Sequence, residues 1–314
     1  MFGLAEVETA RRRIAGATRR TPMWKVEALK RSPVPDTATL WLKLELLQAT
    51  GSFKARGAVN KARSLSAAEL ERGIVTASGG NHGLAVAYVG NLLGVPATIC
   101  LPTNVHPDKV EKLKGWGAKI IVEGANWDIS NRNALAIAET DGLAYIHPFA
   151  DPLVAAGQGT IALEILEDVP QIDTLLVAIG GGGLITGIAA AAKAIKPSIR
   201  IIGIEPVGAQ TLKASLDAGR VMTLPKVETA AVTLAAGRTE PFNFDVIRRH
   251  VDAIVLVTDD EMRQAARWLW SEASIAPELS GAASVAALFN GSVKIQPGEN
   301  VCALVCGAGR DGWT

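Results

Sequence analysis

Charge of one sign is not in excess in this sequence. Its 314 residues contain 32 lysines and arginines against 31 aspartates and glutamates, a formal net charge of +1. Binding to nucleic acid or to an anionic membrane rests on clustered lysine and arginine, which this balance does not favour. We therefore expect neither nucleic acid nor a membrane as a partner.

Cysteines and long apolar runs are also scarce. Cys100, Cys302 and Cys306 are odd in number and lack the close pairing of metal ligands, so a disulfide scaffold and a zinc site are both disfavoured. The first twenty residues alternate apolar and basic side chains, and no apolar run suits a signal peptide or a bilayer span. These absences predict a soluble protein of a reducing, cytoplasmic compartment.

Short β-branched runs alternate with longer helical patterns along most of the chain. This alternation predicts an α/β fold with parallel sheets covered on both faces. The expected strands are 40–44, 73–77, 97–101, 119–122, 174–179, 201–205, 254–257 and 301–306. Helices are expected from Asn81, from Pro107 to near Gly115, and after a capping box formed by Thr258 and Glu261. No linker divides the chain, so we predict two lobes that share one interface, with the chain crossing between them more than once. The large lobe is expected to be 1–70 and 149–314, and the small lobe 71–148.

Two glycine clusters each lie between a predicted strand and a predicted helix. The first consists of Gly180, Gly181, Gly182, Gly183 and Leu184. Backbone N–H groups at a helix start suit an anionic phosphate, although a tight turn for helix–sheet packing is the alternative. The spacing matches neither a Walker loop nor a dinucleotide-binding motif.

The second cluster combines glycines with polar side chains. It consists of Ser78, Gly79, Gly80, Asn81, His82 and Gly83. Such a loop suits a carboxylate at a helix start, although Ser78 or Asn81 could simply cap the helix. A third segment, 48–57, places Lys54 after a Thr-Gly-Ser turn. Lys54 is either an ordinary solvated lysine or an amine held near an anion, and the segment alone does not decide.

Taken together and in this order, these segments resemble the fold type II pyridoxal 5′-phosphate enzymes, in particular the threonine/serine dehydratase and serine racemase group. The resemblance covers nearly the whole chain. It extends over Thr21-Pro22, the segment from Lys43 to Ala58, the loop 78–82, His147-Pro148-Phe149, residues 157–160, the tetraglycine loop, residues 203–206 and the segment Glu278 to Ala282. It implies two α/β lobes with the cofactor between them, a small amino-acid substrate and, because relatives are commonly dimers, a homodimer.

The resemblance also implies roles for individual residues. Lys54 is similar to the lysine that bonds to the cofactor and later removes the substrate α-proton, and Phe53 would flank the cofactor ring. Residues 180–184 would bind the phosphate, Asn81 would contact the ring hydroxyl, and residues 78–82 would hold the substrate carboxylate. Glu278 would border the cofactor pocket.

Cys306 falls where the family places a serine, threonine or cysteine against the pyridine nitrogen. A thiol is a weak and normally neutral donor, so it would leave that nitrogen unprotonated and favour prompt loss of a β-substituent. Without the motif, Cys306 would be interpreted as a small buried hydrophobe.

Gly79 decides between the reactions of this group. Related racemases carry a serine there as a second acid/base, and a glycine cannot move a proton. We therefore predict a lyase that converts a β-hydroxy amino acid to a 2-oxo acid and ammonia. A racemase, a β-replacement synthase of the cysteine or threonine synthase kind, and a non-catalytic binding protein are the alternatives.

Departures from the family pattern concern the substrate and the metal. Val232 and Thr233 replace the Asp-Gly of a family segment, and Trp127 stands where relatives often carry tyrosine, so a bulkier substrate such as phenylserine is a further hypothesis. For a divalent cation, relatives use a glutamate and an aspartate six residues apart. Glu205 is present but Thr211 replaces the aspartate, so no metal is predicted.

Overall fold

Two separate sheets organise the chain in the computed structural model, which describes residues 2–27 and 30–312. The larger sheet has the strand order β1-β2-β10-β7-β8-β9, and every pair is parallel except β1 with β2. Its strands are β1 (Met23–Lys25), β2 (Thr39–Lys43), β7 (Thr174–Ala178), β8 (Arg200–Pro206), β9 (Ala253–Val257) and β10 (Asn300–Leu304).

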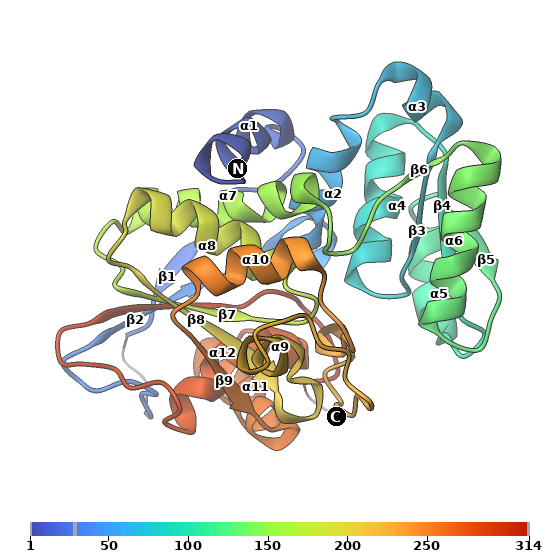
Figure 1. Ribbon diagram of the computed structural model, residues 1–314. Helices are drawn as coiled ribbons and strands as arrows, with labels where there is room; N and C mark the ends of the chain where they lie inside the picture. The colour runs from blue at the N-terminus through green and yellow to red at the C-terminus, as the bar shows by residue number, and fades with distance from the viewer. Residues whose placement is uncertain (1, 28–29, 313–314) are drawn as a thin grey trace.

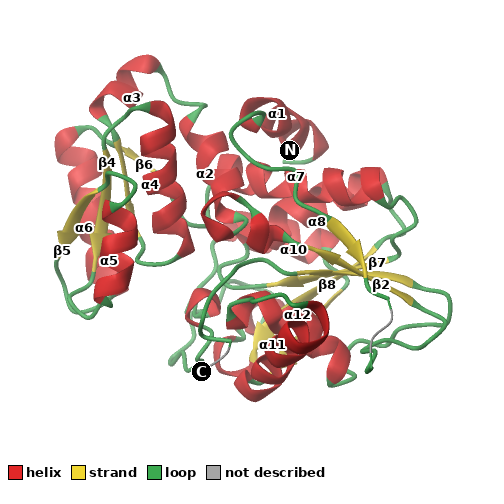
Figure 2. Ribbon diagram, turned by 180° about the vertical axis from the view of Figure 1, so that it is seen from behind, coloured by secondary structure: helices red, strands yellow, loops and turns green. Residues whose placement is uncertain are grey.

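The smaller sheet is parallel throughout, in the order β5-β4-β3-β6. Its strands are β3 (Ile74–Ala77), β4 (Ala97–Leu101), β5 (Lys119–Val122) and β6 (Ala144–Tyr145). Figures 1 and 2 show the two sheets side by side in separate lobes. This second sheet falls inside the predicted small lobe, while the exact division of the chain after residues 70 and 148 stays a prediction.

Helices cover both faces of the larger sheet, as parallel strands buried on both faces require. Figure 1 shows α1, α7, α8 and α10 on one side of it and α11 and α12 on the other. The helices of this lobe are α1 (Leu4–Ile14), α2 (Lys54–Ala62), α7 (Pro152–Asp168), α8 (Gly183–Ile195), α9 (Thr211–Asp217), α10 (Pro241–His250), α11 (Asp259–Ala273) and α12 (Leu279–Phe289). Those near the smaller sheet are α3 (Ala67–Arg72), α4 (Asn81–Leu93), α5 (Pro107–Lys114) and α6 (Trp127–Asp141), and short 3₁₀ turns are η1 (Glu45–Leu47), η2 (Ala49–Gly51), η3 (Val207–Ala209) and η4 (Val232–Leu234).

The α/β class and the expected strands are confirmed to within one or two residues at each end. The helix starts at Asn81 and Pro107 are also confirmed, as is the capping box of Thr258 and Glu261. Two strands were not predicted, β1 and β6, which are three and two residues long. Such short strands carry no readable alternation, because pairing with a neighbour creates them rather than local preference.

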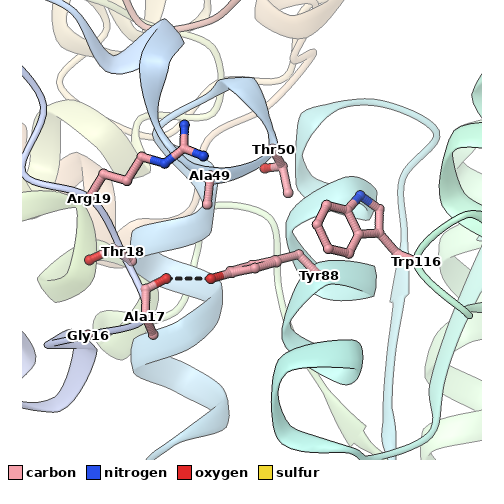
Figure 3. A pocket seen from close by; sticks show the side chains of 8 residues that line it. All are labelled: Gly16, Ala17, Thr18, Arg19, Ala49, Thr50, Tyr88 and Trp116. Carbon is pink, nitrogen blue, oxygen red and sulfur yellow. Dashed lines mark hydrogen bonds between the residues drawn. The ribbon is translucent and has the colours of Figure 1, made fainter.

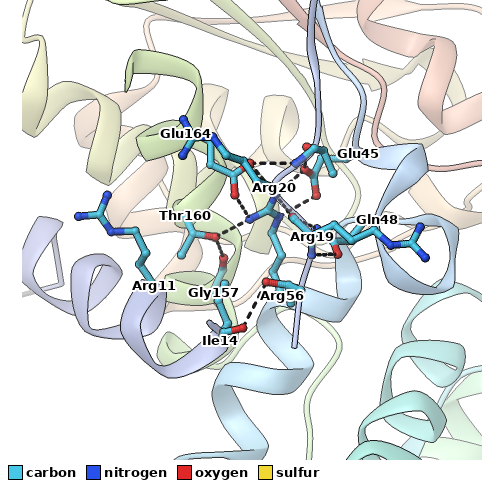
Figure 4. A network of polar contacts seen from close by, with 12 residues as sticks. Arg11, Ile14, Arg19, Arg20, Glu45, Gln48, Arg56, Gly157, Thr160 and Glu164 are labelled. Carbon is cyan, nitrogen blue, oxygen red and sulfur yellow. Dashed lines mark hydrogen bonds and ion pairs between the residues drawn. The ribbon is translucent and has the colours of Figure 1, made fainter. Parts of the chain in front are cut away.

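Helix α2 is fixed in the larger lobe by a buried ion cluster around Arg56 (Figure 4). The Arg56 guanidinium donates to both oxygens of Glu45, at 2.8 Å each, and to both oxygens of Glu164, at 2.7 and 2.9 Å. Lys43 Nζ donates to Glu164 at 2.6 Å. Burial alone would lower the pKa of Arg56, but the carboxylates of Glu45 and Glu164 raise it above its ordinary value. Two cations therefore balance two anions, and the first turn of α2 is held rigidly.

The two lobes also meet at a cavity of about 320 Å³ beside η2 (Figure 3). Tyr88 and Trp116 reach it from the smaller lobe, and the Tyr88 hydroxyl donates to the Ala17 carbonyl at 2.6 Å. None of the predicted site residues lines this cavity. Among the residues with described positions, no helix is both long enough and apolar enough to cross a bilayer.

Candidate active site

Lys54 begins α2 at the junction of several segments of the larger lobe. The Phe53 N–H donates to the Cys306 carbonyl at 3.2 Å, and Ala308 N–H donates to the Gly51 carbonyl at 2.9 Å. These bonds join the start of α2 to the chain that follows β10. Lys54 Nζ donates to the Pro148 carbonyl at 2.6 Å and lies 5.1 Å from the centre of the Phe53 ring. The amine therefore has a fixed position.

The environment of Lys54 favours its neutral form. Burial lowers the pKa of Lys54 to about 8, although the nearby Cys306 and Glu278 act in the opposite direction. Its position in the first turn of a helix also disfavours a positive charge there. Within the described ranges no carboxylate forms an ion pair with it; its hydrogen-bond acceptor is the uncharged Pro148 carbonyl. An amine that loses its proton near neutral pH can act as a nucleophile and as a base.

The tetraglycine loop lies next to the same Pro148-Phe149 segment. A Cβ atom at Gly181 would be 2.4 Å from the Phe149 ring, and one at Gly183 would be 2.5 Å from the Phe149 carbonyl oxygen. Gly182 has a φ of +96°, a conformation that disfavours side chains. Because α8 begins at Gly183, the first N–H groups of the helix have no partner inside it. The loop is thus a cradle of N–H donors with no room for side chains.

Asn81 and Glu278 link the two lobes at the same place. Asn81 begins α4 in the smaller lobe, and its Nδ2 donates to Glu278 Oε1 at 2.8 Å. Ser280 also donates to this oxygen, at 2.5 Å. Burial raises the pKa of Glu278 to about 7, while the hydrogen bonds from Ser280, Thr233 and Asn81 oppose the rise. Glu278 is therefore a buried acceptor that both lobes share.

Cys306 lies near Glu278, just beyond the end of β10. Its Sγ contacts the Ser280 carbonyl oxygen at 3.5 Å, and the side chain is 2% exposed. Burial raises the pKa of Cys306, and the neighbouring Glu278 raises it further. The thiol is therefore neutral, as a weak donor.

The loop from Ser78 to Gly83 leads from β3 into α4. Ser78 Oγ accepts a hydrogen bond from the Gly80 N–H at 3.3 Å, and a Cβ atom at Gly83 would lie only 1.9 Å from the Ser78 carbonyl oxygen. The His82 ring is buried, with Nε2 3.0 Å from the Ile146 carbonyl oxygen. Burial lowers the pKa of His82 to about 3, with a further contribution from Lys54, so the ring is uncharged. The assignment of His82 to the substrate carboxylate stays a prediction.

Several residues that shape the site were not among the predicted site residues. Phe149 and Ser280 belong to segments that carry the family resemblance, and Thr233 belongs to a segment noted for departing from the family pattern, so these were the available signals for them. Asn243 and Thr239 donate to the Gly181 carbonyl at 3.0 and 3.1 Å. No sequence motif marks these two, because they reach the loop only through the packing of α10 and the residues before it.

Trp127 and Glu205, which the sequence analysis considered for the substrate and for a metal, both bond to backbone groups. Trp127 donates from its indole to the Ala77 carbonyl at 2.8 Å and is 40% exposed. Glu205 accepts the N–H groups of Leu212 and Lys213, at 2.8 Å each, and so caps the start of α9. Within 2–27 and 30–312, no group of three or more His, Cys, Asp or Glu is arranged to hold a metal ion.

Comparisons with known proteins agree with this geometry. A family model described as "Pyridoxal-phosphate dependent enzyme" matches residues 14–307. An L-threonine ammonia-lyase of Thermotoga maritima is 38% identical over 99% of this chain and 76% of its own length. A catabolic L-threonine dehydratase of Staphylococcus aureus is 38% identical over 99% of this chain and 90% of its own length. The solved structure of maize serine racemase superposes with a TM-score of 0.92 at 36% identity, covering 98% of this chain and 93% of that one.

Proposed function

Since the chain belongs to the pyridoxal-phosphate-dependent enzymes, as a lyase of the threonine/serine dehydratase and serine racemase group, we propose that it is an ammonia-lyase for β-hydroxy amino acids of the serine and threonine type. The substrate loses its α-proton and β-hydroxyl as water, and the unsaturated amine then takes up water and releases ammonia and a 2-oxo acid. The observation that carries the proposal is the Lys54 amine, held on an uncharged carbonyl next to a cradle of N–H groups.

The residues present fit the cofactor, pyridoxal 5′-phosphate. The cradle of residues 180–184 would hold the phosphate, because a Cβ atom at Gly181 or Gly183 would collide with Phe149 and close it. Lys54 would bond to the aldehyde and Phe53 would flank the ring. Asn81, backed by Glu278, would contact the ring hydroxyl. When bound, the cofactor withdraws electrons from the substrate α-carbon.

The side chains then divide the work of the elimination. Lys54 in its neutral form takes the α-proton at Nζ, and the Pro148 carbonyl orients that amine. Cys306 would face the ring nitrogen as a neutral thiol, a weak donor that provides little charge stabilisation there. Prompt departure of the β-hydroxyl then becomes the favoured outcome. The backbone N–H groups of residues 78–82 would hold the substrate carboxylate at the start of α4.

Gly79 supports elimination over racemisation. Racemisation requires a second group that moves a proton on the opposite face of the substrate. The nearest atoms to a Cβ placed at Gly79 are methyl carbons of Val105 and Leu101, at 3.2 and 3.4 Å. Neither can carry a proton, so the proposed enzyme acts on one face only.

The test is a 2-oxo acid release assay across serine, threonine, threo-3-hydroxyaspartate and phenylserine isomers, combined with chiral analysis of the remaining serine. We expect 2-oxo acid and ammonia in equal amounts and no D-serine from L-serine. Appreciable D-serine would contradict the role of Gly79. Turnover of O-acetylserine or O-phosphohomoserine without activity on any hydroxy amino acid would favour a β-replacement synthase. A protein that binds the cofactor and turns over none of these would be a binding protein.

A bulkier substrate such as phenylserine is the second candidate. The partly exposed Trp127 indole lies beside the start of the Ser78 loop, and Val232 is 68% exposed. Both offer apolar surface to a side chain larger than a methyl group. A higher kcat/KM for a phenylserine isomer than for threonine supports this candidate, and a lower one excludes it.

We further propose a cytoplasmic homodimer. The support for the compartment is that Cys100, Cys302 and Cys306 are all free and buried, as in a reducing environment. The support for the dimer is the family resemblance alone. Light scattering of the cofactor-loaded protein should give twice the chain mass of 32.9 kDa, and a single-chain mass would contradict the dimer.

A further inference from the structure

The turn η4 lies against the glycine loops of both lobes. A Cβ atom at Gly180 would be 3.0 Å from the Thr233 carbonyl oxygen and 3.2 Å from Leu234 Cα. A Cβ atom at Gly80 would be 3.8 Å from Thr233 Cγ2. Thr233 thus stands between the loop proposed for the phosphate and the loop proposed for the substrate carboxylate. Thr233 is also exposed to solvent.

The Thr233 hydroxyl is turned toward the Glu278 carboxylate. Thr233 Oγ1 lies 2.7 Å from Ser280 Oγ as its donor and 3.3 Å from Glu278 Oε1. Ser280 in turn donates to the same Glu278 oxygen, which also accepts the Asn81 amide. The result is a chain of hydrogen bonds that runs from the Thr233 hydroxyl to a buried carboxylate and then across to the other lobe.

Glu278 needs this support because its surroundings disfavour charge. Burial raises the pKa of Glu278, and Asp311 from the end of the chain raises it further. Lys54 from α2 and the Cys306 thiol after β10 are the other titratable groups next to it. Thr233 and Ser280 contribute hydrogen bonds that favour the carboxylate, the form that accepts the Asn81 amide without competition.

We propose that Thr233 is a positioning residue, whose hydroxyl acts through Ser280 to hold the Glu278 carboxylate on the Asn81 amide and so fixes the start of α4 against the larger lobe. The inference rests on the proposed function, because Asn81 is there assigned to the cofactor ring. Its consequence is that Thr233 controls how tightly the cofactor is held without touching the reacting atoms. The residue would also adjust the pH range in which that contact persists.

The test compares Thr233→Val, which keeps the shape and removes the hydroxyl, with Thr233→Ser, which keeps the hydroxyl. We expect Thr233→Val to weaken cofactor binding about fivefold, as the net loss of the hydrogen bond between the neutral Thr233 and Ser280 hydroxyls predicts. Its cofactor absorption spectrum should also change with pH at a higher midpoint than in the wild type. Thr233→Ser should restore both values to within about twofold. Val207→Ala changes an exposed valine of another 3₁₀ turn, η3, and is the control.

A double variant with Ser280→Ala separates this chain of bonds from a general disturbance. Both hydroxyls act through one carboxylate, so their losses should not add. Compared with the single variant of lower cofactor affinity, the double variant should lose at most about a further twofold in affinity. Fully additive losses, or a Thr233→Val protein that matches wild type in affinity and midpoint, would overturn the inference. If wild type binds the cofactor and releases 2-oxo acid while Thr233→Val is unchanged, only this inference fails. If wild type does neither, the proposed function itself fails.

Discussion

Lys54 and Arg56 stand two residues apart in the first turn of α2, yet their surroundings differ completely. Arg56 is fully buried and makes paired hydrogen bonds to two carboxylates, with Lys43 completing the balance of charge. Lys54, in contrast, pairs with none of the carboxylates among the described residues and donates to the Pro148 carbonyl. The same turn thus holds one cation permanently charged and lets the other lose its proton at about pH 8. The comparison separates structural charge from chemical reactivity: compensation marks the first, and its absence marks the second.

The largest loss of stability is expected when Arg56 is replaced. Arg56→Leu leaves the buried carboxylates of Glu45 and Glu164 without their main partner, so the free energy of unfolding should fall by about 3–5 kcal/mol. Denaturant unfolding followed by far-UV circular dichroism measures this loss. Lys54→Met serves as the control, because it removes a cation that forms no ion pair with any carboxylate in residues 2–27 and 30–312. An Arg56→Leu protein as stable as Lys54→Met would show that the ion cluster is not structural.

Two glycine variants distinguish the surroundings of Arg56, where stability should change, from those of Lys54, where cofactor binding should change. A Cβ atom at Gly157 would lie 2.6 Å from the Arg56 carbonyl oxygen, where α7 crosses α2, so Gly157→Ala should lower stability by about 1–3 kcal/mol. A Cβ atom at Gly181 would collide with the Phe149 ring, so Gly181→Ala should weaken cofactor binding by about tenfold or more. Gly115→Ala, at an uncrowded helix end, is the control. If both variants lowered stability and cofactor affinity equally, the proposed difference between the two regions would be wrong.

The pH dependence of stability sharpens the contrast, since the pKa of Lys54 lies at about 8 in the folded protein, below its ordinary value of 10.5. Between these two values the unfolded chain holds a proton that the folded chain has released, so this group's contribution to stability rises with pH. Lys54→Met should therefore be most stabilised relative to apo wild type below pH 8. The advantage should shrink as the pH rises toward 10.5. Denaturation midpoints of both proteins across this range measure it; a difference independent of pH would contradict the low pKa.

The smallest effect is expected from an exposed ion pair. Lys114 and Glu111 are 3.1 Å apart on the surface of α5. Lys114→Ala should change the free energy of unfolding by about 0.5 kcal/mol or less. The same unfolding assay measures it, and a loss comparable to that of Arg56→Leu would mean that burial does not decide the value of these pairs.

Sequence and structure agree where local patterns carry the information. The parallel strands have short apolar runs, and the helix starts at Asn81 and Pro107 have recognisable capping or proline signals, so these elements were predictable. The tetraglycine loop was singled out because backbone N–H groups at a helix start suit a phosphate, and Lys54 because of the family resemblance, since its own segment does not decide its role. The contacts that link them were not predictable. Pro148, Thr233 and Asn243 reach the site from distant segments, and only the packing of the two lobes brings them together.

The direction of side chains was also beyond the sequence. His82 belongs to a polar loop and was expected at the substrate, but the position of its ring is set by a contact to the Ile146 carbonyl, which lies far from it in the sequence. Likewise, Glu205 was considered as a metal ligand on its spacing from Thr211. The structure shows its carboxylate occupied by backbone N–H groups at the start of α9.

The most direct test of the central claim, that the uncompensated amine of Lys54 performs the chemistry, compares wild type with Lys54→Ala after both are incubated with pyridoxal 5′-phosphate. The measurement is 2-oxo acid release from serine and threonine, recorded together with visible absorption after unbound cofactor is removed. Wild type should retain the visible band and release product, whereas Lys54→Ala should lose the band and at least about 10³-fold in rate. A Lys54→Ala protein that keeps full activity would contradict the account.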